Sequence, residues 1–178
     1  MKFKKTDTMK CNVFADEIKA LRKRIGSNSF NNKEDLREFI KDYTKLIYDH
    51  KMIGLLYDYY DENIIYRKEN RITIVGVEAL VVDILELLSM FPDMAVDLEE
   101  IIISGDSDKG YKVWRRIRYR GTNLNHTKYG PPSNKELGDG CIGLSMMFIN
   151  KVNNSWKITE EHHSISSSYI RDVCTISV

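Results

Sequence analysis

The chain has 178 residues, of which 42% are hydrophobic and 30% are charged, and its formal net charge is +1. This length suits one domain with a sizeable core, and the composition excludes a disordered chain. The small net charge gives no overall field that would attract nucleic acid or anionic lipid. No apolar run approaches the roughly 20 residues that a membrane-spanning helix needs.

The cysteines and the basic N-terminal residues indicate the cellular compartment in which the protein is expected. Cys11, Cys141 and Cys174 are few and widely spaced, which suits a reducing environment, and they form no CxxC pair of the kind that binds metal. The stretch MKFKKTDTMK is not followed by the apolar segment of a secretory signal. We therefore expect a cytoplasmic protein that holds no metal or other cofactor.

The first part of the chain is expected to form a tail and one helix. Residues 1–12 are interpreted as a loosely docked tail. The next segment has apolar residues at helical spacing and is followed by Gly26, which predicts a helix over residues 13–25. We interpret residues 1–31 as an N-terminal extension and residues 32–178 as the main domain.

The main domain begins with helices. Asn32 is a suitable N-cap, with acidic residues in the first turn where the helix dipole favours them. The helix continues to His50 with an apolar stripe that includes Tyr43. Beyond it, the pattern predicts a short helix at residues 51–60, a short strand at 64–67, a short apolar segment at 71–75 and a helix at 77–91.

The second half of the chain has strand patterns with turn-like connections, at residues 95–103, 111–122, 141–152 and 156–168. Asn153–Ser155 forms a tight turn between the last two strands, which predicts a hairpin. Helices that precede an antiparallel sheet are typical of the α+β class. We expect one curved antiparallel sheet that wraps around the helices and leaves a cavity between them.

The strand at residues 111–122 has two chemically different faces, because side chains alternate along a strand. Arg116 and Arg118 share one face, where Asp97 and Glu99 of the preceding strand can pair with them as surface ion pairs. Arg115 belongs to the apolar face, so it is the better candidate for binding an anion.

The order of these elements resembles the SnoaL-like branch of the nuclear-transport-factor-2-like superfamily, over about residues 36–168. The resemblance rests on Tyr48-Asp49-His50, Asp61-Glu62-Asn63, Gly76-Val77-Glu78, Phe91-Pro92-Asp93-Met94, Arg116 with Gly121-Thr122, and Gly143–Ile149 followed by Trp156-Lys157-Ile158.

This resemblance implies a cone-shaped α+β fold: a curved antiparallel sheet closed by helices around a largely apolar pocket. Members often form homodimers through the outer sheet face. The superfamily includes polyketide cyclases, ketosteroid isomerase, limonene-epoxide hydrolase, dehydratases and binding proteins without activity, so the fold alone does not give the function.

The catalytic carboxylates of these enzymes have no counterpart in the sequence. Isomerase-like members place a tyrosine near Tyr43, but their base falls where this chain has Ile65-Tyr66-Arg67-Lys68. The cyclase carboxylate falls at Ser166, which is no general acid near neutral pH. Both departures weigh against catalysis.

The last strand carries the remaining candidates for acid–base chemistry. Adjacent residues on a strand point to opposite faces, so His162 and His163 cannot bind one metal together. Glu160 with His162, or Glu161 with His163, shares a face and could form an acid–base couple. The alternative is that both couples are ordinary solvated or interfacial polar positions.

We conclude from the sequence that the chain binds a small apolar or aromatic molecule, with a cyclase-, dehydratase- or isomerase-like enzyme as the alternative. Its expected partners are this ligand and a second copy of the chain, not nucleic acid or a membrane. The candidate catalytic residues are Tyr43, Glu160, Glu161, His162 and His163. The candidate ligand contacts are Trp114, Arg115, Ile117, Tyr119, His126, Met146 and Ser166.

Overall fold

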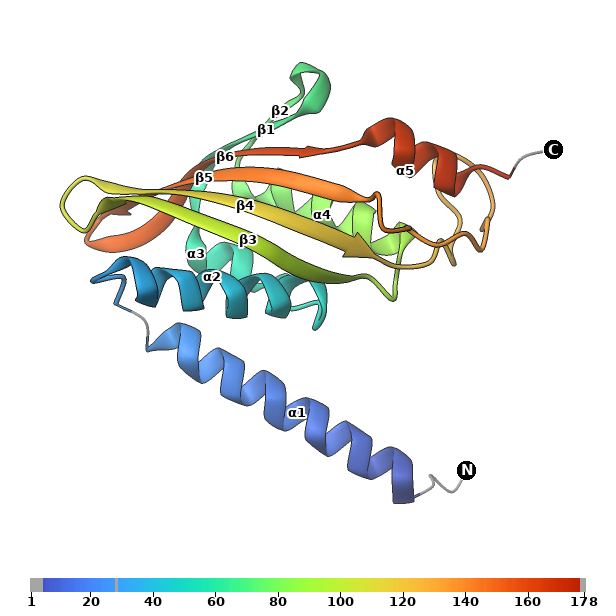
Figure 1. The fold of residues 1–178 in the computed structure, drawn as a ribbon, viewed down its shortest axis with the longest axis horizontal. Helices are drawn as coiled ribbons and strands as arrows, with labels where there is room; N and C mark the ends of the chain where they lie inside the picture. Colours follow the sequence, from blue (N-terminus) through green and yellow to red (C-terminus); the bar gives the residue numbers. More distant parts are fainter. Residues whose placement is uncertain (1–4, 28, 177–178) are drawn as a thin grey trace.

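A computed structural model describes residues 5–27 and 29–176. The chain folds as an α+β protein in which one curved sheet is packed against helices (Figure 1). The helices are α1 (Lys5–Gly26), α2 (Lys33–Tyr48), α3 (Leu55–Tyr59), α4 (Val77–Met90) and α5 (Ser167–Cys174), with a 3-10 turn η1 (Glu69–Arg71). The strands are β1 (Tyr60–Lys68), β2 (Thr73–Val75), β3 (Ala95–Asp106), β4 (Gly110–Arg120), β5 (Ile142–Val152) and β6 (Ser155–Ile165).

The six strands of the sheet follow the order β2-β1-β6-β5-β4-β3. Four of the five pairings are antiparallel, as expected, whereas β1 and β6 run parallel. A parallel pair needs a long crossover rather than a tight turn. Here the whole chain between β1 and β6 provides that crossover, which brings the early and late segments of the main domain together.

The core lies between the concave face of the sheet and the helices α2, α3 and α4. Figure 1 shows α4 behind the sheet and α2 along its lower edge, beside β3. The apolar stripe predicted for α2 is buried, and Asn32 caps this helix by accepting hydrogen bonds from the backbone N–H groups of Glu34 and Asp35 at 2.9 Å. The expected cone of helices and sheet is therefore confirmed.

The N-terminal helix α1 is longer than expected, because it begins at Lys5 and not at residue 13. It packs on α2, on the side away from the sheet (Figure 1). Leu21 is buried in this contact, and Arg24 forms an ion pair with Asp42 at 2.6 Å. The interpretation of residues 1–12 as a tail is wrong for residues 5–12; residues 1–4 lie outside the described part.

Two other expected boundaries are corrected. The short helix covers Leu55–Tyr59 and not residues 51–60. The last strand ends at Ile165, because the Ser166 side chain accepts a hydrogen bond from the backbone N–H of Tyr169 and caps α5. A serine side chain that satisfies a free N–H favours a helix start over continued strand.

The hairpin between β5 and β6 is confirmed. Its turn residues Asn153 and Asn154 have φ angles of 49° and 62°. Asparagine tolerates this left-handed conformation, which a two-residue hairpin turn of type I′ requires at both positions.

The outer sheet face carries ion pairs between β3 and β4, with the expected partners for Glu99 but with a different partner, Arg120, for Asp97. Glu99 pairs with Arg118 at 2.6 Å and with Arg116 at 3.0 Å, and Asp97 pairs with Arg120. A register shift between Leu98 and Glu100 allows Glu99 to reach both arginines.

In the described part of the chain, no helix has the length and apolar character needed to cross a membrane.

Candidate functional site

A cavity of about 270 Å³ opens between α4, the strands β1 and β6, the long loop before β5, and α5. Its wall is largely apolar and aromatic, as in most small-molecule sites. The mouth carries two ion pairs, Lys68 with Asp83 at 2.6 Å and Lys128 with Glu86 at 2.8 Å. The apolar and aromatic lining residues are Tyr48, Tyr66, Ile72, Ile84, Leu87, Met90, Tyr129, Ile165 and Ile170.

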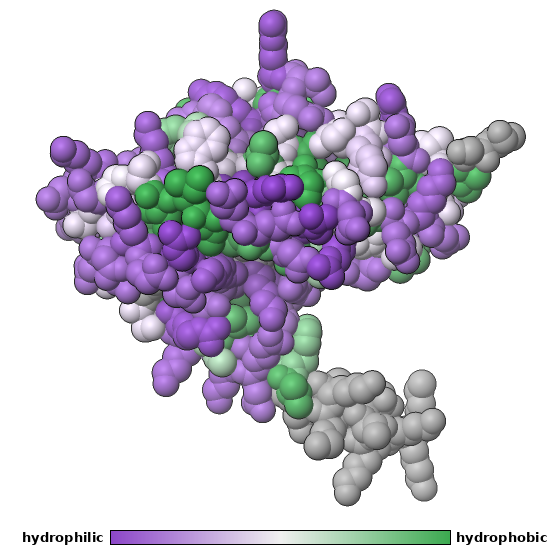
Figure 2. Space-filling model, viewed as in Figure 1, coloured by the Kyte–Doolittle hydropathy of each residue, from purple (hydrophilic) through white to green (hydrophobic). Residues whose placement is uncertain are grey.

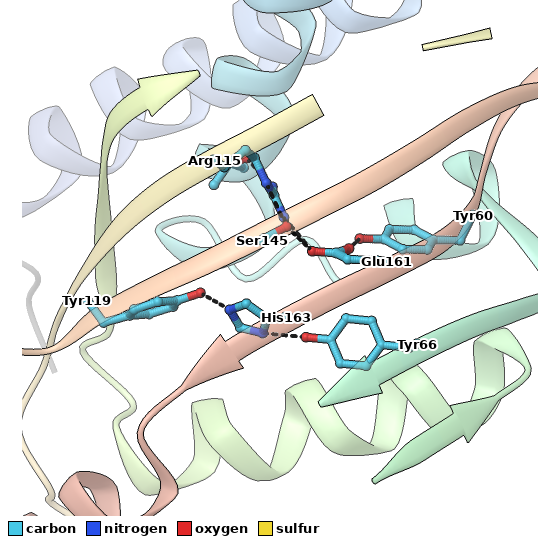
Figure 3. Close-up of polar contacts among 8 residues, drawn as sticks. Tyr60, Tyr66, Arg115, Tyr119, Ser145, Glu161 and His163 are labelled. Carbon is cyan, nitrogen blue, oxygen red and sulfur yellow. Dashed lines mark hydrogen bonds and ion pairs between the residues drawn. The ribbon is translucent and has the colours of Figure 1, made fainter. Parts of the chain in front are cut away.

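His163 lies on the inner face of β6, and its side chain lines this cavity. Its Nδ1 is 2.5 Å from the hydroxyl of Tyr66, and its Nε2 is 2.9 Å from the hydroxyl of Tyr119. Figure 3 shows the two tyrosines on opposite sides of the imidazole. Burial lowers the pKa of His163 to about 4, an effect that Glu161 opposes and Arg115 reinforces. The ring is therefore neutral near pH 7.

Gly143 of β5 makes room for this contact. A Cβ atom at Gly143 would lie 2.7 Å from the Tyr119 ring and 3.2 Å from Nε2 of His163. Any larger residue would push these two side chains apart. A glycine is therefore needed at position 143 to leave space for Tyr119 and His163, which the strand pattern of residues 141–152 alone does not reveal.

Beside His163, the buried carboxylate of Glu161 is held by three neighbours. It pairs with Arg115 at 2.6 Å and accepts hydrogen bonds from Ser145 at 2.6 Å and Tyr60 at 2.5 Å (Figure 3). Burial is the largest single effect and would raise the pKa of Glu161, but Arg115, His163 and the hydrogen bonds from Ser145 and Tyr60 together outweigh it, so that the pKa is lowered. The carboxylate therefore stays charged.

The guanidinium of Arg115 is occupied by this network. It also donates to Ser145 at 3.0 Å and to Thr44 at 3.1 Å, and the residue is 6% exposed. An anion from solvent would have to displace Glu161 from a pair that is already desolvated. The expectation of an anion site at Arg115 is corrected on this ground: its charge is used inside the protein.

Tyr43 of α2 lies at the other side of the same network. Its hydroxyl is buried and has no hydrogen-bond partner among the described residues. It borders a space of about 10 Å³, enough for about one water-sized group, together with Arg115 and Glu161. Tyr48, Tyr66 and Ile84 line both this space and the large cavity, so these three side chains separate the two.

The two acidic–histidine couples lie on opposite faces of β6, as strand alternation predicts. Glu161 and His163 are buried on the inner face, where each is bound by other residues. Glu160 and His162 are in contact at 2.7 Å on the outer face, where Arg67 also pairs with Glu160. The outer couple therefore has no access to the large cavity.

Several predicted ligand contacts lie away from the large cavity. Trp114 and Met146 border a hollow of about 300 Å³ on the outer sheet face. His126 is exposed in the loop, and Ser166 caps α5. Ile117 is buried in the core, and Tyr119 contacts His163, which lines the cavity.

The sequence reasoning did not single out Tyr48, Tyr60 or Tyr66. Tyr60 and Tyr66 are buried on β1, which pairs with β6 and thereby places Tyr66 next to His163. A signal was present, because the even-numbered Tyr60, Ile64 and Tyr66 form one alternating face. The parallel pairing of β1 with β6, which places this face beside His163, cannot be predicted from residues close in sequence.

Solved structures give the comparison that decides the fold. A putative SnoaL-like polyketide cyclase from Jannaschia sp. CCS1 matches with a TM-score of 0.58 and 12% identity, over 75% of this chain and 89% of that one. A putative polyketide cyclase from Acidithiobacillus ferrooxidans matches with a TM-score of 0.58 and 14% identity, over 82% and 96%. An NTF2-like protein with a cystatin-like fold from Novosphingobium aromaticivorans matches with a TM-score of 0.55 and 14% identity, over 85% and 92%.

The chain has the cystatin-like fold. This agrees with the resemblance to SnoaL-like and NTF2-like proteins that the order of sequence motifs indicated. No protein-family model and no curated protein matches the chain. At 12–14% identity the three structures show the cystatin-like fold alone, and the function has to be argued from the site.

Proposed function

We propose that the chain binds a small, uncharged, largely apolar molecule with an aromatic ring in the cavity of about 270 Å³. The observation that carries this proposal is the composition of the wall, with three tyrosines and six aliphatic or methionine side chains around a neutral imidazole. Such a wall favours a flat apolar ligand with one polar group. The fold adds support, because two of the similar structures are named as putative polyketide cyclases.

The charges at the mouth favour an uncharged ligand. Lys68 and Lys128 line the cavity, but each is paired with an acidic side chain from α4. An anionic ligand would have to compete with Asp83 or Glu86 for the paired lysine, whereas a neutral one leaves both pairs intact. This is why we infer a neutral molecule rather than an anion.

Binding is better supported than acid–base catalysis. Both nitrogen atoms of His163 are taken by tyrosine hydroxyls, and the oxygen atoms of Glu161 are taken by Arg115, Ser145 and Tyr60. A general base needs an atom within reach of the proton that it removes. In this arrangement neither inner candidate offers such an atom directly to the cavity.

The experiment is a ligand screen by thermal shift, with 2-naphthol as the first probe. A ligand that binds only the folded chain raises its Tm by mass action. We expect 2-naphthol to raise the Tm, and Leu87→Trp, which fills the cavity, to weaken this binding at least tenfold. Leu85→Trp is the matched control, because Leu85 is on the same helix but exposed. Equal binding by both variants would contradict the proposal.

We also propose that a second copy of the chain covers the outer sheet face. Ile102, Trp114 and Leu144 are about half exposed on three adjacent strands and form one apolar ridge. Hollows of about 300 Å³ and 190 Å³ border this ridge, and both are lined by Trp114 and Leu144. Figure 2, which views this face, shows hydrophobic residues in green beside hydrophilic residues in purple.

A two-fold pair suits this face because it requires one surface to fit itself. The ridge can enter the hollow of the other copy, and nearby charges of both signs, such as Arg116 and Glu100, can pair across the interface. The buried free thiols Cys141 and Cys174 suit the reducing cytoplasm, where we propose that this dimer works.

The oligomeric state tests this second proposal. We expect sedimentation analysis to give a dimer for the natural chain and a monomer for Trp114→Glu, because a buried unpaired charge costs several kcal/mol. Val82→Glu is the control, because Val82 is even more exposed than Trp114 but lies on α4. A monomeric natural chain, or a dimer that survives Trp114→Glu, would contradict it.

A further inference from the structure

The contacts of His163 impose a condition on its two tyrosine partners. A neutral imidazole has one N–H donor and one nitrogen that accepts. Because both nitrogen atoms contact a hydroxyl, one tyrosine must accept from the ring while the other donates to it. Burial raises the pKa of both Tyr66 and Tyr119 well above the ordinary value, so each keeps its own proton.

The two tautomers of His163 leave Tyr66 with opposite hydrogen-bonding capacity. With the proton on Nδ1, Tyr66 accepts from the ring, and its own O–H is free to donate elsewhere. With the proton on Nε2, Tyr66 donates to Nδ1, and its oxygen lone pairs are free to accept. Tyr66 and His163 both line the large cavity, so the free capacity is available to a bound molecule.

Tyr119 can follow either state. It is fully buried, and the hydroxyl of Tyr48 is its second hydrogen-bond partner. A hydroxyl both donates and accepts, so Tyr119 can accept from Nε2–H or donate to Nε2 while it keeps a bond to Tyr48. The tautomer change therefore leaves no buried polar group on this side unpaired.

We propose that the hydrogen bonds joining Tyr66, His163 and Tyr119 can exchange donor and acceptor roles. This reversible contact lets the cavity accept a ligand hydroxyl and a ligand carbonyl equally well. A ligand hydroxyl that donates to Tyr66 stabilises the Nε2–H tautomer, and a ligand carbonyl, which can only accept, stabilises the Nδ1–H tautomer. Tyr119 acts through His163 as a positioning residue. This inference rests on the proposed function and extends it to the ligand class: paired aromatic alcohols or phenols and ketones of one skeleton.

Removal of the Tyr119 hydroxyl is expected to fix the direction of the contact. In Tyr119→Phe, the Nε2–H tautomer would leave a buried N–H without a partner, which native structures rarely tolerate. The ring is then held with its proton on Nδ1, and Tyr66 can only donate. Carbonyl ligands keep their hydrogen bond, whereas hydroxyl ligands lose the bond that they donate to Tyr66 and can only accept from it, which a phenol oxygen does weakly.

The experiment combines NMR of the His163 imidazole nitrogens with binding of three probes: naphthalene, 2-naphthol and 2-acetylnaphthalene. In the natural chain we expect both tautomers without ligand, a shift toward Nε2–H with 2-naphthol, and a shift toward Nδ1–H with 2-acetylnaphthalene. Tyr119→Phe should show Nδ1–H alone and bind 2-naphthol roughly threefold to tenfold more weakly, with unchanged affinity for the ketone.

Two further variants separate this inference from loss of structure. Tyr66→Phe should reduce both polar probes to the affinity of naphthalene. Tyr111→Phe should change neither probe, because Tyr111 is an equally buried residue of β4 whose hydroxyl donates to the backbone of Phe30, outside the cavity.

The outcomes distinguish the two proposals. If none of the three probes binds, the proposed function fails, and this inference fails with it. If the probes bind but His163 keeps one tautomer with every ligand, or Tyr119→Phe weakens the alcohol and the ketone alike, only the reversible contact is overturned.

Discussion

Glu161→Ala is expected to lower the free energy of unfolding by about 3–5 kcal/mol, because it leaves the charge of Arg115 buried without a partner. Both side chains of this pair are at most 5% exposed, so water cannot replace the lost carboxylate. Ser145 and Tyr60 lose an acceptor at the same time. Urea denaturation at one protein concentration measures the change.

The control for this prediction is the neighbouring residue. Glu160→Ala removes a carboxylate from the same strand but from the outer face, where its partners are partly solvated. Its expected cost is about 0–1 kcal/mol. Similar costs for the two variants would mean that Glu161 is not the partner on which Arg115 depends.

The buried pair has a consequence for the cavity as well as for stability. An ion pair in the core is weak evidence of stabilisation, because apolar residues of similar volume often give an equally stable protein. Arg115 and Glu161 instead fix the positions of Thr44, Ser145 and Tyr60 around the inner end of the site. We infer that the pair holds the rigid floor on which Tyr66 and His163 present their polar groups.

Much of the fold depends on residues that are close in sequence, and these features were predicted from the sequence. Asn32 as an N-cap, the Asn153–Ser155 turn and the alternation along residues 111–122 each depend on neighbours within a few positions. The separation of His162 from His163 follows from the same alternation. These features are set by backbone geometry, which a short stretch of sequence reports directly.

The site itself depends on contacts that short-range patterns do not report. Tyr66 reaches His163 across 97 positions of sequence, and Tyr60 reaches Glu161 across 101. Both contacts follow from the parallel pairing of β1 with β6, which no turn motif in the sequence indicates. The contact between Arg115 and Glu161 has a different origin, because it depends on the antiparallel pairing of β5 with both β4 and β6, but it too joins residues far apart in the sequence.

The stability of the chain is expected to fall steeply between pH 7 and pH 4, and His163 is the main cause. Its pKa is about 4 in the folded protein against 6.5 for the unperturbed group. Below pH 6.5 the unfolded chain therefore binds a proton that the folded chain does not, and stability decreases until the folded pKa is reached. The loss is about 2 kcal/mol at pH 5 and about 3 kcal/mol at pH 4.

Glu161 acts in the same direction but in a lower window. Its pKa is lowered from 4.5 in the folded state, so its stabilisation is present above pH 4.5 and is lost as the pH falls further. Measurements between pH 7 and pH 5 thus report mainly on the imidazole.

His163→Gln is the variant that isolates the imidazole, because an amide does not titrate yet can still donate to one tyrosine and accept from the other. We expect its stability to change by less than about 0.5 kcal/mol over the same range. His126→Gln, in the exposed loop, should keep the full dependence of the natural chain. A steep profile that persists in His163→Gln would show that the imidazole is solvated or charged in the folded protein. The neutral ring on which the reversible contact depends would then be excluded.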